Sequence, residues 1–167
     1  MRTPPRPLLT LTAADLMSRD LVLIPQHMSL RTAGQLLSRS CISGAPVVDE
    51  AGRCVGVLSV NDFLQRAVKE GQPMALAPRT SCACSDWQIA DTEQLPVEEG
   101  GAYMTADPVT VSPSTALVDL ARMMLDAHIH RVIVVDGDRR PVGVVSSTDI
   151  LAAVAHAGLP RAAGEQE

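Results

Sequence analysis

Apolar residues follow the same order of spacings in two stretches of the chain. Each stretch opens with a short alternating run, Val22–Ile24 in the first and Val109–Val111 in the second, which predicts a strand. After a polar break, apolar residues recur three and four positions apart, as on one buried face of a helix. These residues are Leu30, Ala33, Leu36 and Leu37 in the first stretch, and Leu117, Leu120, Met123 and Met124 in the second. The pattern predicts a strand followed by a helix, twice.

Two further apolar runs with a polar turn between them follow each predicted helix. The turns are Asp49–Gly52 and Asp136–Arg139, and their Asp and Gly residues favour hairpins. A second helix closes each stretch, with apolar residues at matching positions. These are Phe63, Leu64, Ala67 and Val68, and Ile150, Leu151, Val154 and Ala155. The predicted unit is β-α-β-β-α, and it occurs twice in a fold of the α/β (α+β) class.

The two units are copies of one another. A shift of 87 positions places Met17–Asp20 on Met104–Asp107, and Val55–Ser59 on Val142–Ser146, without a gap. Duplicated units of this length bury their apolar faces against each other. We therefore expect the two repeats to pack with pseudo-twofold symmetry into one module, with paired clefts where they meet.

The repeats and the intervening segments define the expected organisation of the chain. The repeats should occupy residues 8–69 and 101–158. Residues 70–100 have no counterpart in the repeat and are rich in Pro, Gly, Ser and acidic residues, which indicates a linker or insertion. The ends of the chain, residues 1–7 and 159–167, are predicted to be disordered.

Composition narrows the class of protein. Hydrophobic residues make up 46% of the chain and aromatic residues only 2%, so the core must be aliphatic. The net charge is −5, and without a Lys/Arg cluster or aromatic stacking platforms we expect no nucleic-acid partner. No apolar run reaches the length of a membrane span, and the N-terminus does not read as a signal peptide. These features predict no membrane association and a cytoplasmic location.

Three short motifs carry a specific resemblance. They are Gly56-Val-Leu-Ser-Val-Asn-Asp62, Gly143-Val-Val-Ser-Ser-Thr-Asp149 and His130-Arg-Val-Ile-Val-Val-Asp136. With the order of the predicted elements, the chain resembles a free-standing pair of cystathionine β-synthase (CBS) domains, the arrangement called a Bateman module. The resemblance covers nearly all of residues 12–155 outside the insertion. It implies a regulatory module that binds an adenine nucleotide (AMP, ADP or ATP).

Each repeat carries a Ser-x-x-Asp motif where its last strand meets its last helix, Ser59 to Asp62 and Ser146 to Asp149. One interpretation is a variant capping box, in which the pair stabilises the first helical turn. The other, implied by the resemblance, is a nucleotide site in which the carboxylate accepts hydrogen bonds from two ribose hydroxyls. The two interpretations are compatible. The candidate set also includes Asn61 and Thr148, which lie inside the motifs.

Three basic residues precede the second strand of the second repeat: His128, His130 and Arg131. Because that strand and the next form a hairpin, its start should lie beside Ser146. An Arg at this edge can hold a phosphate through forked hydrogen bonds, and a His can add a donor whose charge depends on pH. The alternative is a helix C-terminus whose dipole these cations complement.

The first repeat differs at the same positions. Ser43 and Gly44 replace His130 and Arg131, so the cleft near Asp62 lacks a cation of its own at this edge. We therefore expect two unequal sites, of which the Asp149 site is better equipped for a charged phosphate. An apolar slot for adenine could come from the first strands of the repeats, although both residues could equally be ordinary core. The candidate residues are Val22 and Val109.

The four cysteines, Cys41, Cys54, Cys82 and Cys84, are expected to be reduced thiols. Cys82-Ala-Cys84 lacks the spacing of a zinc site and has no second Cys or His pair nearby, so no metal site is predicted. A redox or metal sensor built on these two cysteines is the weaker alternative.

No arrangement of residues indicates catalysis, and no required cofactor is expected. The leading hypothesis is an adenine-nucleotide sensor that acts in trans on an unknown protein target. The competing hypothesis is a ligand-free scaffold in which the Ser and Asp residues are helix caps only. The resemblance also implies a homodimer formed through the helices. Residues expected to supply that contact are Met123, Met124, Leu125, Ile150 and Leu151.

Overall fold

The computed structural model describes residues 7–70, 76–78, 87–89, 95 and 97–158. The predicted disorder of the chain ends, apart from Pro7, lies outside these residues. The same holds for the predicted thiols of Cys82 and Cys84.

The chain forms two compact units whose boundaries cross those of the sequence repeats. Unit 1 consists of Met1–Arg19, Thr110–Asp136 and Val142–Glu167, and unit 2 of Asp20–Val109 and Gly137–Pro141. Each unit therefore combines most of one repeat with a shorter piece of the other. Both contain a small sheet and packed helices, which confirms the predicted α/β class and the duplicated unit. The pseudo-twofold packing of the repeats stays a prediction.

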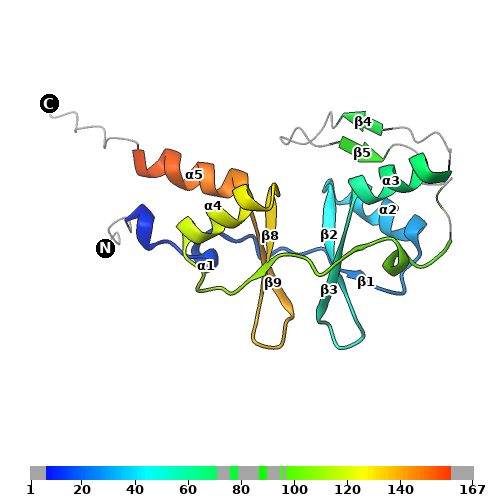
Figure 1. The fold of residues 1–167 in the computed structure, drawn as a ribbon, viewed down its shortest axis with the longest axis horizontal. Helices are drawn as coiled ribbons and strands as arrows, with labels where there is room; N and C mark the ends of the chain where they lie inside the picture. Colours follow the sequence, from blue (N-terminus) through cyan, green and yellow to red (C-terminus); the bar gives the residue numbers. More distant parts are fainter. Residues whose placement is uncertain (1–6, 71–75, 79–86, 90–94, 96, 159–167) are drawn as a thin grey trace, which may run out of the picture. The chain divides into compact units, whose positions relative to one another are not determined.

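Unit 2 is built on a four-stranded sheet in the order β1-β2-β3-β6 (Figure 1). The strands are β1 (Ile24–Pro25), β2 (Gly44–Val48), β3 (Cys54–Ser59) and β6 (Thr105–Ala106). β1 lies parallel to β2, whereas β3 is antiparallel to both β2 and β6. The sheet therefore contains the predicted hairpin, β2–β3, at its centre.

Two helices complete the core of unit 2, α2 (Leu30–Arg39) and α3 (Val60–Glu70). The side chain of Ser29 caps α2 by accepting a hydrogen bond from the backbone N–H of Thr32 at 3.1 Å. Phe63 of α3 is almost fully buried. The core around it is aliphatic, as the composition predicts, and consists mainly of Ile24, Leu30, Ala33, Leu37, Ala45, Val47, Leu58, Val60 and Leu95.

Unit 1 repeats this plan with a three-stranded sheet in the order β7-β8-β9. Its strands are β7 (Thr110–Val111), β8 (Arg131–Val135) and β9 (Pro141–Ser146), and its helices are α4 (Leu117–Asp126) and α5 (Ser147–Gly158). Two short helices precede them, η1 (Leu8–Thr10) and α1 (Ala13–Leu16). The core consists of Ala13, Val111, Leu120, Met124, Val132, Val134 and Val145.

Two sequence predictions need correction in these elements. The first strand of each repeat begins later than predicted, β1 at Ile24 rather than Val22 and β7 at Thr110 rather than Val109. Met124, predicted to supply a dimer contact, is only 5% exposed and belongs to the core of unit 1. It cannot serve as an association surface.

The segment in front of each repeat packs against the strand hairpin of the other repeat. Ser18 pairs with Val144 through two backbone hydrogen bonds of 3.0 Å. In the same register, Thr105 of β6 pairs with Val57 of β3. Met17 and Met104, which precede these residues, pack on Gly143 and Gly56, where a Cβ would overlap the methionine side chain. The match between Met17–Asp20 and Met104–Asp107 therefore reflects the same packing in both units. In each unit, the segment in front of one repeat pairs with the last strand of the other repeat, and we call this the segment exchange.

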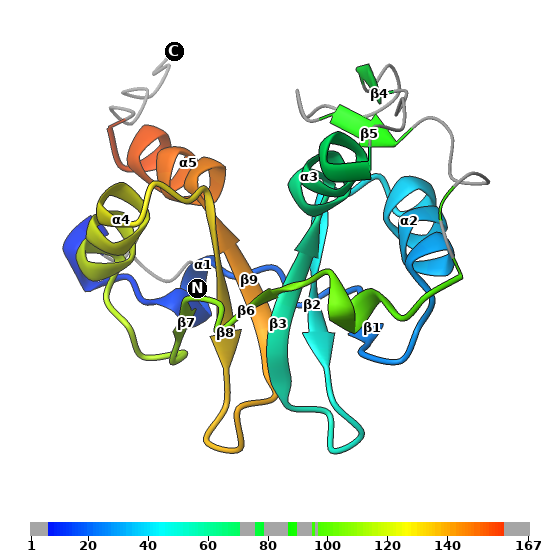
Figure 2. The same cartoon turned by 45° about the vertical axis from the view of Figure 1, so that its right-hand side comes forward.

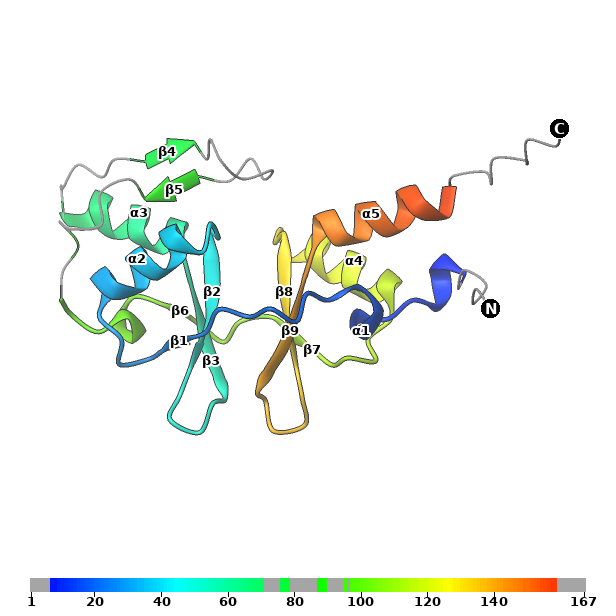
Figure 3. The same cartoon turned by 180° about the vertical axis from the view of Figure 1, so that it is seen from behind.

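The described part of the insertion between the repeats packs against the helices of unit 2, to which it belongs. It contains an antiparallel pair of strands, β4 (Leu76–Pro78) and β5 (Trp87–Ile89), and leads into η2 (Gly100–Ala102). β5 contacts α2 and α3, beside which the hairpin lies in each view (Figures 1 and 3). Leu95 is buried in the core of this unit.

Candidate functional site

In unit 1, β9 leads directly into α5 (Figure 2). Ser146, the last residue of β9, holds Asp149 at the N-terminus of α5. The backbone N–H and the hydroxyl of Ser146 both donate to Oδ2 of Asp149, at 2.7 Å and 2.6 Å. The Asp149 N–H lies 3.2 Å from Ser146 Oγ, which closes a reciprocal box. Among the described residues, no donor reaches Oδ1 of Asp149. The motif is therefore a helix cap that leaves one carboxylate oxygen available.

The basic residues of the second repeat lie at the same edge of the sheet. The N–H of Ser147 donates to the carbonyl of His130 at 2.9 Å, so the start of β8 is beside the end of β9, as the hairpin geometry predicts. Arg131 is the first residue of β8, and both His130 and Arg131 are exposed. The carboxylate and two basic side chains thus come from adjacent strand ends within one unit.

His128 and Thr148 are less directly connected to this edge. His128 follows α4 in a left-handed conformation, with φ of 51°, and its side chain is exposed. Within the described residues, no hydrogen bond or ion pair joins its side chain to Asp149, so its position fits the helix-end interpretation better than the phosphate one. Thr148 is exposed on the first turn of α5. Val109 falls in unit 2 and is 38% exposed.

In unit 2, Asp62 occupies the equivalent place at the start of α3. The backbone N–H and hydroxyl of Ser59 donate to Oδ2 of Asp62, each at 2.7 Å. The second carboxylate oxygen, Oδ1, accepts a hydrogen bond of 2.9 Å from the hydroxyl of Thr105. Both oxygens of Asp62 are therefore engaged inside the unit, whereas only one oxygen of Asp149 is.

Thr105 is a site residue that the sequence reasoning missed. It comes from β6, which belongs to the leading segment of the second repeat but pairs with β3 of the first. Its counterpart in the repeat is Ser18, which lies at the same register position beside β9. A hydroxyl at both positions, within a tetrapeptide whose Met and Asp also match between the repeats, was the available signal.

The start of β2 explains why the first site has no cation at its edge. The carbonyl of Ser43 accepts a hydrogen bond from the Val60 N–H at 2.8 Å, which matches the bond between Ser147 and His130. Gly44 pairs with Ser59, and a Cβ at position 44 would lie 3.1 Å from the Ser59 Cβ. A side chain the size of Arg131 would therefore be crowded at this position.

The structure also places three further residues of unit 2, namely Val22, Asn61 and Arg66. Val22 is half-buried and packs against the core of unit 2, which is the ordinary core role rather than a demonstrated adenine slot. Asn61 is exposed. Arg66, one turn beyond Asp62 on α3, places its guanidinium 5.5 Å from the ring centroid of Tyr103, a cation–π contact.

The Tyr103 hydroxyl donates to Oε2 of Glu98. This bond raises the pKa of Tyr103 because it favours the protonated phenol beside a carboxylate. The nearby tyrosine is thus a hydrogen-bond donor to a neighbouring side chain rather than an acid or base directed at Asp62.

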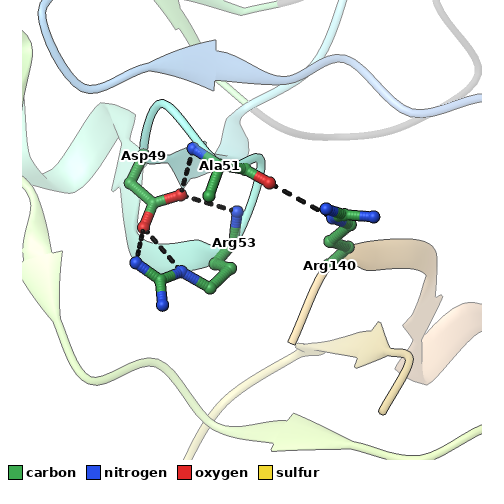
Figure 4. A network of polar contacts seen from close by, with 4 residues as sticks. All are labelled: Asp49, Ala51, Arg53 and Arg140. Atoms are coloured by element: carbon green, nitrogen blue, oxygen red, sulfur yellow. Dashed lines mark hydrogen bonds and ion pairs between the residues drawn. The ribbon is translucent and has the colours of Figure 1, made fainter. Parts of the chain in front are cut away.

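The turns of the two hairpins meet in a polar network within unit 2 (Figure 4). Oδ1 of Asp49 accepts hydrogen bonds of 2.9 Å from the N–H groups of Ala51 and Arg53, and its Oδ2 pairs with the Arg53 guanidinium at 2.8 Å. The backbone bond from Arg53 is the main cause that lowers the pKa of Asp49. Nε of Arg140, in the second hairpin, donates to the Ala51 carbonyl at 3.1 Å. This network holds the two turns together, and both carboxylate oxygens of Asp49 already accept hydrogen bonds within it.

The described residues also bear on the thiol and metal alternatives. Cys41 and Cys54 form no disulfide within the described residues, and burial raises the pKa of Cys54. In the described part of the chain, no cluster of three or more His, Cys, Asp or Glu side chains is suited to a metal ion. The hypothesis of a sensor built on Cys82 and Cys84 lies outside the described residues.

A duplicated βαββα unit with a capped carboxylate at each last helix is the arrangement expected for the family that the motifs resemble. The chain belongs to the CBS domain family, whose model matches residues 13–69 and 98–156. Both matched segments contain one Ser-x-x-Asp motif.

A similar relative is the chloroplastic CBS domain-containing protein CBSX2 of Arabidopsis thaliana. It is 28% identical over 149 residues, which cover 85% of this chain and 63% of that protein. The chain thus spans less than two thirds of the length of this relative. No helix among the described residues combines the length and apolar character that crossing a membrane requires.

Two solved structures show the same fold at comparable similarity. The structure of CBSX2 in complex with AMP is 25% identical, with a TM-score of 0.65 over 87% of this chain and 96% of that one. The cytosolic domain of the Mg²⁺ channel MgtE in complex with ATP is 27% identical, with a TM-score of 0.62 over 84% of this chain and 48% of that one.

Proposed function

We propose that this protein is a regulatory adenine-nucleotide-binding module and that the Asp149 edge of unit 1 is its main ligand site. The observation that carries the proposal is the geometry of Asp149. Ser146 orients the carboxylate through one oxygen, and among the described residues the other oxygen has no donor. A carboxylate oriented in this way suits a vicinal diol, because each ribose hydroxyl can donate to it.

Charge at the same edge supports a phosphorylated ligand. His130 and Arg131 begin the strand beside Ser146, and a guanidinium pairs with phosphate through two parallel hydrogen bonds. The proposed arrangement places the ribose on Asp149 and the phosphate near Arg131. The candidate contact set on this unit is Ser146, Thr148, Asp149, Arg131, His130 and, more distantly, His128.

The Asp62 edge is proposed as the weaker site. Thr105 already occupies the second oxygen of Asp62, so a ribose would have to displace that hydrogen bond or share the oxygen. The corresponding strand begins with Ser43 and Gly44, which bring no positive charge. A ligand there would gain less from its phosphate, and an uncharged nucleoside suits this edge better than a nucleotide does.

Proteins of the same fold support an adenine nucleotide as the ligand class without selecting one. CBSX2 was solved in complex with AMP, and the cytosolic domain of MgtE in complex with ATP. A homodimer, a protein target regulated in trans and a cytoplasmic location complete the proposal. Its energetic basis is differential affinity, because a ligand shifts a conformational equilibrium only when it binds one state better.

Calorimetric titration tests the proposal directly. We expect AMP to bind and 2′,3′-dideoxy-AMP, which retains the base and phosphate, to bind on the order of 100-fold more weakly because two charge-assisted hydrogen bonds are lost. Equal affinity for the two would remove the ribose role from Asp149. Absence of binding by AMP, ADP, ATP and adenosine at millimolar concentration would overturn the nucleotide function itself.

A ligand-free scaffold is the second candidate, because both Ser-x-x-Asp motifs do form helix-capping contacts. If capping is their entire role, Asp149→Asn should lower the melting temperature and no ligand should restore it. If Asp149 also binds a nucleotide, AMP should raise the melting temperature of the wild type and not that of the variant.

A further inference from the structure

The aspartates of the two Ser-x-x-Asp motifs differ in how many hydrogen bonds they already accept. Asp62 accepts two on Oδ2 from Ser59 and one on Oδ1 from the Thr105 hydroxyl. Among the described residues, Asp149 accepts two on Oδ2 from Ser146 and none on Oδ1. A carboxylate has about four acceptor positions, two on each oxygen. Within the described residues, Asp149 therefore keeps both positions of Oδ1, whereas Asp62 keeps one.

The backbone around Thr105 holds its hydroxyl against Asp62. Thr105 belongs to β6, where it pairs with Val57 of β3. The preceding residue, Met104, packs on Gly56, where a Cβ would lie 2.4 Å from the methionine Sδ. A shift of β6 away from β3 would break this pairing and this packing together. The Thr105 hydroxyl is therefore a fixed part of the Asp62 site.

Side-chain contacts of Tyr103 anchor the same segment of unit 2. Tyr103 lies two residues before Thr105, and its hydroxyl donates to Glu98. The guanidinium of Arg66 lies 5.5 Å from the centroid of the tyrosine ring. In unit 1, the repeat positions that match Glu98, Tyr103 and Arg66 carry side chains without a polar group, namely Leu11, Leu16 and Ala153. This anchor is therefore a feature of the first site.

Ser18, the counterpart of Thr105, has a different relation to its aspartate. It meets β9 through an isolated bridge to Val144. In the part of the chain that the structure describes, no hydrogen bond joins its hydroxyl to Asp149, whose Oδ2 accepts from Ser146. Equivalent hydroxyls thus occupy an acceptor position in one site and leave it open in the other.

We propose that Thr105 is a specificity-determining residue, which makes the Asp62 site selective for nucleosides with a single ribose hydroxyl. One remaining acceptor position takes one hydroxyl, so the second hydroxyl of a ribose would lose its water partners without gaining a bond to Asp62. A monodeoxyadenosine, which lacks the 2′ or the 3′ hydroxyl, avoids this cost. The Asp149 site takes the complete diol. The inference rests on the adenine-nucleotide function proposed above and adds the sugar selectivity of each site.

Two single-site variants separate the two specificities. Asp149→Asn retains an oxygen that accepts from Ser146 but presents an amide to the ligand, so the remaining binding is at Asp62, and Asp62→Asn isolates the Asp149 site in the same way. In calorimetry, Asp62→Asn should bind adenosine on the order of tenfold more tightly than either monodeoxyadenosine. Asp149→Asn should bind one of the two monodeoxyadenosines at least as tightly as adenosine. Equal preference for adenosine in both variants overturns the inference.

Substitutions of Thr105 in the Asp149→Asn background test its role. Thr105→Val keeps the shape of the side chain without the hydroxyl, and should create a preference for adenosine on the order of tenfold. Thr105→Ser keeps a hydroxyl and should show no such preference. Ser18→Ala in the Asp62→Asn background is the matched control and should retain the preference for adenosine. An unchanged sugar preference in Thr105→Val, with wild-type circular dichroism, overturns the inference, and Thr105→Ala replaces this variant if it does not fold.

The same titrations distinguish a failure of this inference from a failure of the proposed function. If Asp149→Asn binds no nucleoside at millimolar concentration while Asp62→Asn binds adenosine, the Asp62 site has no sugar selectivity to assign and only the inference fails. If neither variant nor the wild type binds adenosine or AMP, the proposed function fails as well.

Discussion

The Asp62 and Asp149 sites have the same backbone arrangement and different side-chain chemistry. In each, a serine donates twice to one carboxylate oxygen, and the next residue donates its N–H to the strand opposite. The sites diverge at the other carboxylate oxygen, which Thr105 engages only in unit 2. They diverge again at the neighbouring strand, which begins with a cation only in unit 1.

This difference distinguishes the contacts that stabilise the fold from the contacts that a bound nucleotide would use. The contacts of Ser59 and Ser146 stabilise the start of a helix in both units, so a loss of either would destabilise the fold. The contacts that differ contribute little to the helix start and much to the charge and hydrogen-bonding capacity of the edge. Changes that exchange features between the two sites should therefore alter binding and stability separately.

The largest effect is expected from removing the two carboxylates in turn. Asp149→Ala should weaken AMP binding on the order of 100-fold, because hydrogen bonds to a charged group are worth about 1.5–3 kcal/mol each. Asp62→Ala should change AMP affinity less than about threefold, since its site lacks a cation. Isothermal titration calorimetry measures both.

The two carboxylate variants also serve as controls for each other in stability. Each loses a helix cap, so both should lower the free energy of unfolding by about 1 kcal/mol. Equal loss of AMP binding in both variants would show that the two sites contribute equally to binding.

The next effect concerns the glycines on which the exchanged segments pack. Gly56→Ala should lower the free energy of unfolding by about 2 kcal/mol, because the added Cβ would meet Met104 and, at 2.9 Å, the Thr105 carbonyl. Gly143→Ala should cost about as much, because its Cβ would lie 2.4 Å, 2.7 Å and 2.8 Å from Sδ, Cγ and Cβ of Met17.

Urea unfolding followed by circular dichroism checks these values. Gly137→Ala is the control, because a Cβ there has nothing within 4 Å, and it should leave the unfolding midpoint unchanged. Wild-type stability of both Gly56→Ala and Gly143→Ala would contradict the close packing of Met104 and Met17 on these glycines.

Replacing the cation of the second site makes it resemble the first. Arg131→Gly should weaken AMP binding about tenfold by removing a charge-assisted phosphate contact, and should leave adenosine binding nearly unchanged. The comparison of the two ligands in one variant isolates the phosphate. A similar loss for adenosine would assign Arg131 to the base or ribose, or to the fold.

The smallest effect is expected at the hairpin turns. Arg139 has a left-handed backbone with φ of 62°, and its counterpart in the first repeat is Gly52, with φ of 77°. Arg139→Gly should raise the free energy of unfolding by about 0.5 kcal/mol, because relief of the left-handed strain exceeds the added flexibility of the unfolded chain. Gly52→Ala should lower it by a similar amount. Thermal unfolding monitored by circular dichroism compares them, and a destabilised Arg139→Gly would show that the arginine side chain matters more than its backbone.

Local patterns were sufficient to predict most of the fold and half of each candidate site. Periodic apolar residues identified the helices and hairpins, and hairpin geometry alone was enough to place His130 beside the end of β9. Thr105 was not predicted because it lies 43 residues from Asp62 and reaches it through a segment exchange that leaves no periodic signal.

The insertion escaped prediction for a related reason. Its composition is that of a linker, yet Leu95 docks where α2 has Gly34 instead of a larger residue. The fit depends on two residues far apart in the chain, Gly34 and Leu95, and neither is unusual when considered alone. Met124 shows the opposite error, since its helical spacing with Leu120 already indicated burial.

The exchange of leading segments also determines when each unit can form during synthesis of the protein on the ribosome. Unit 1 joins α1, which is made before β1, to β9, which is made after β8, through the pairing of Ser18 with Val144. Contacts between such distant residues slow folding, since the chain must close a long loop before they form. Unit 2 needs only β6 and a five-residue turn from the later sequence. We therefore expect unit 2 to form before unit 1 on the nascent chain, with α1 exposed until β9 has left the ribosome.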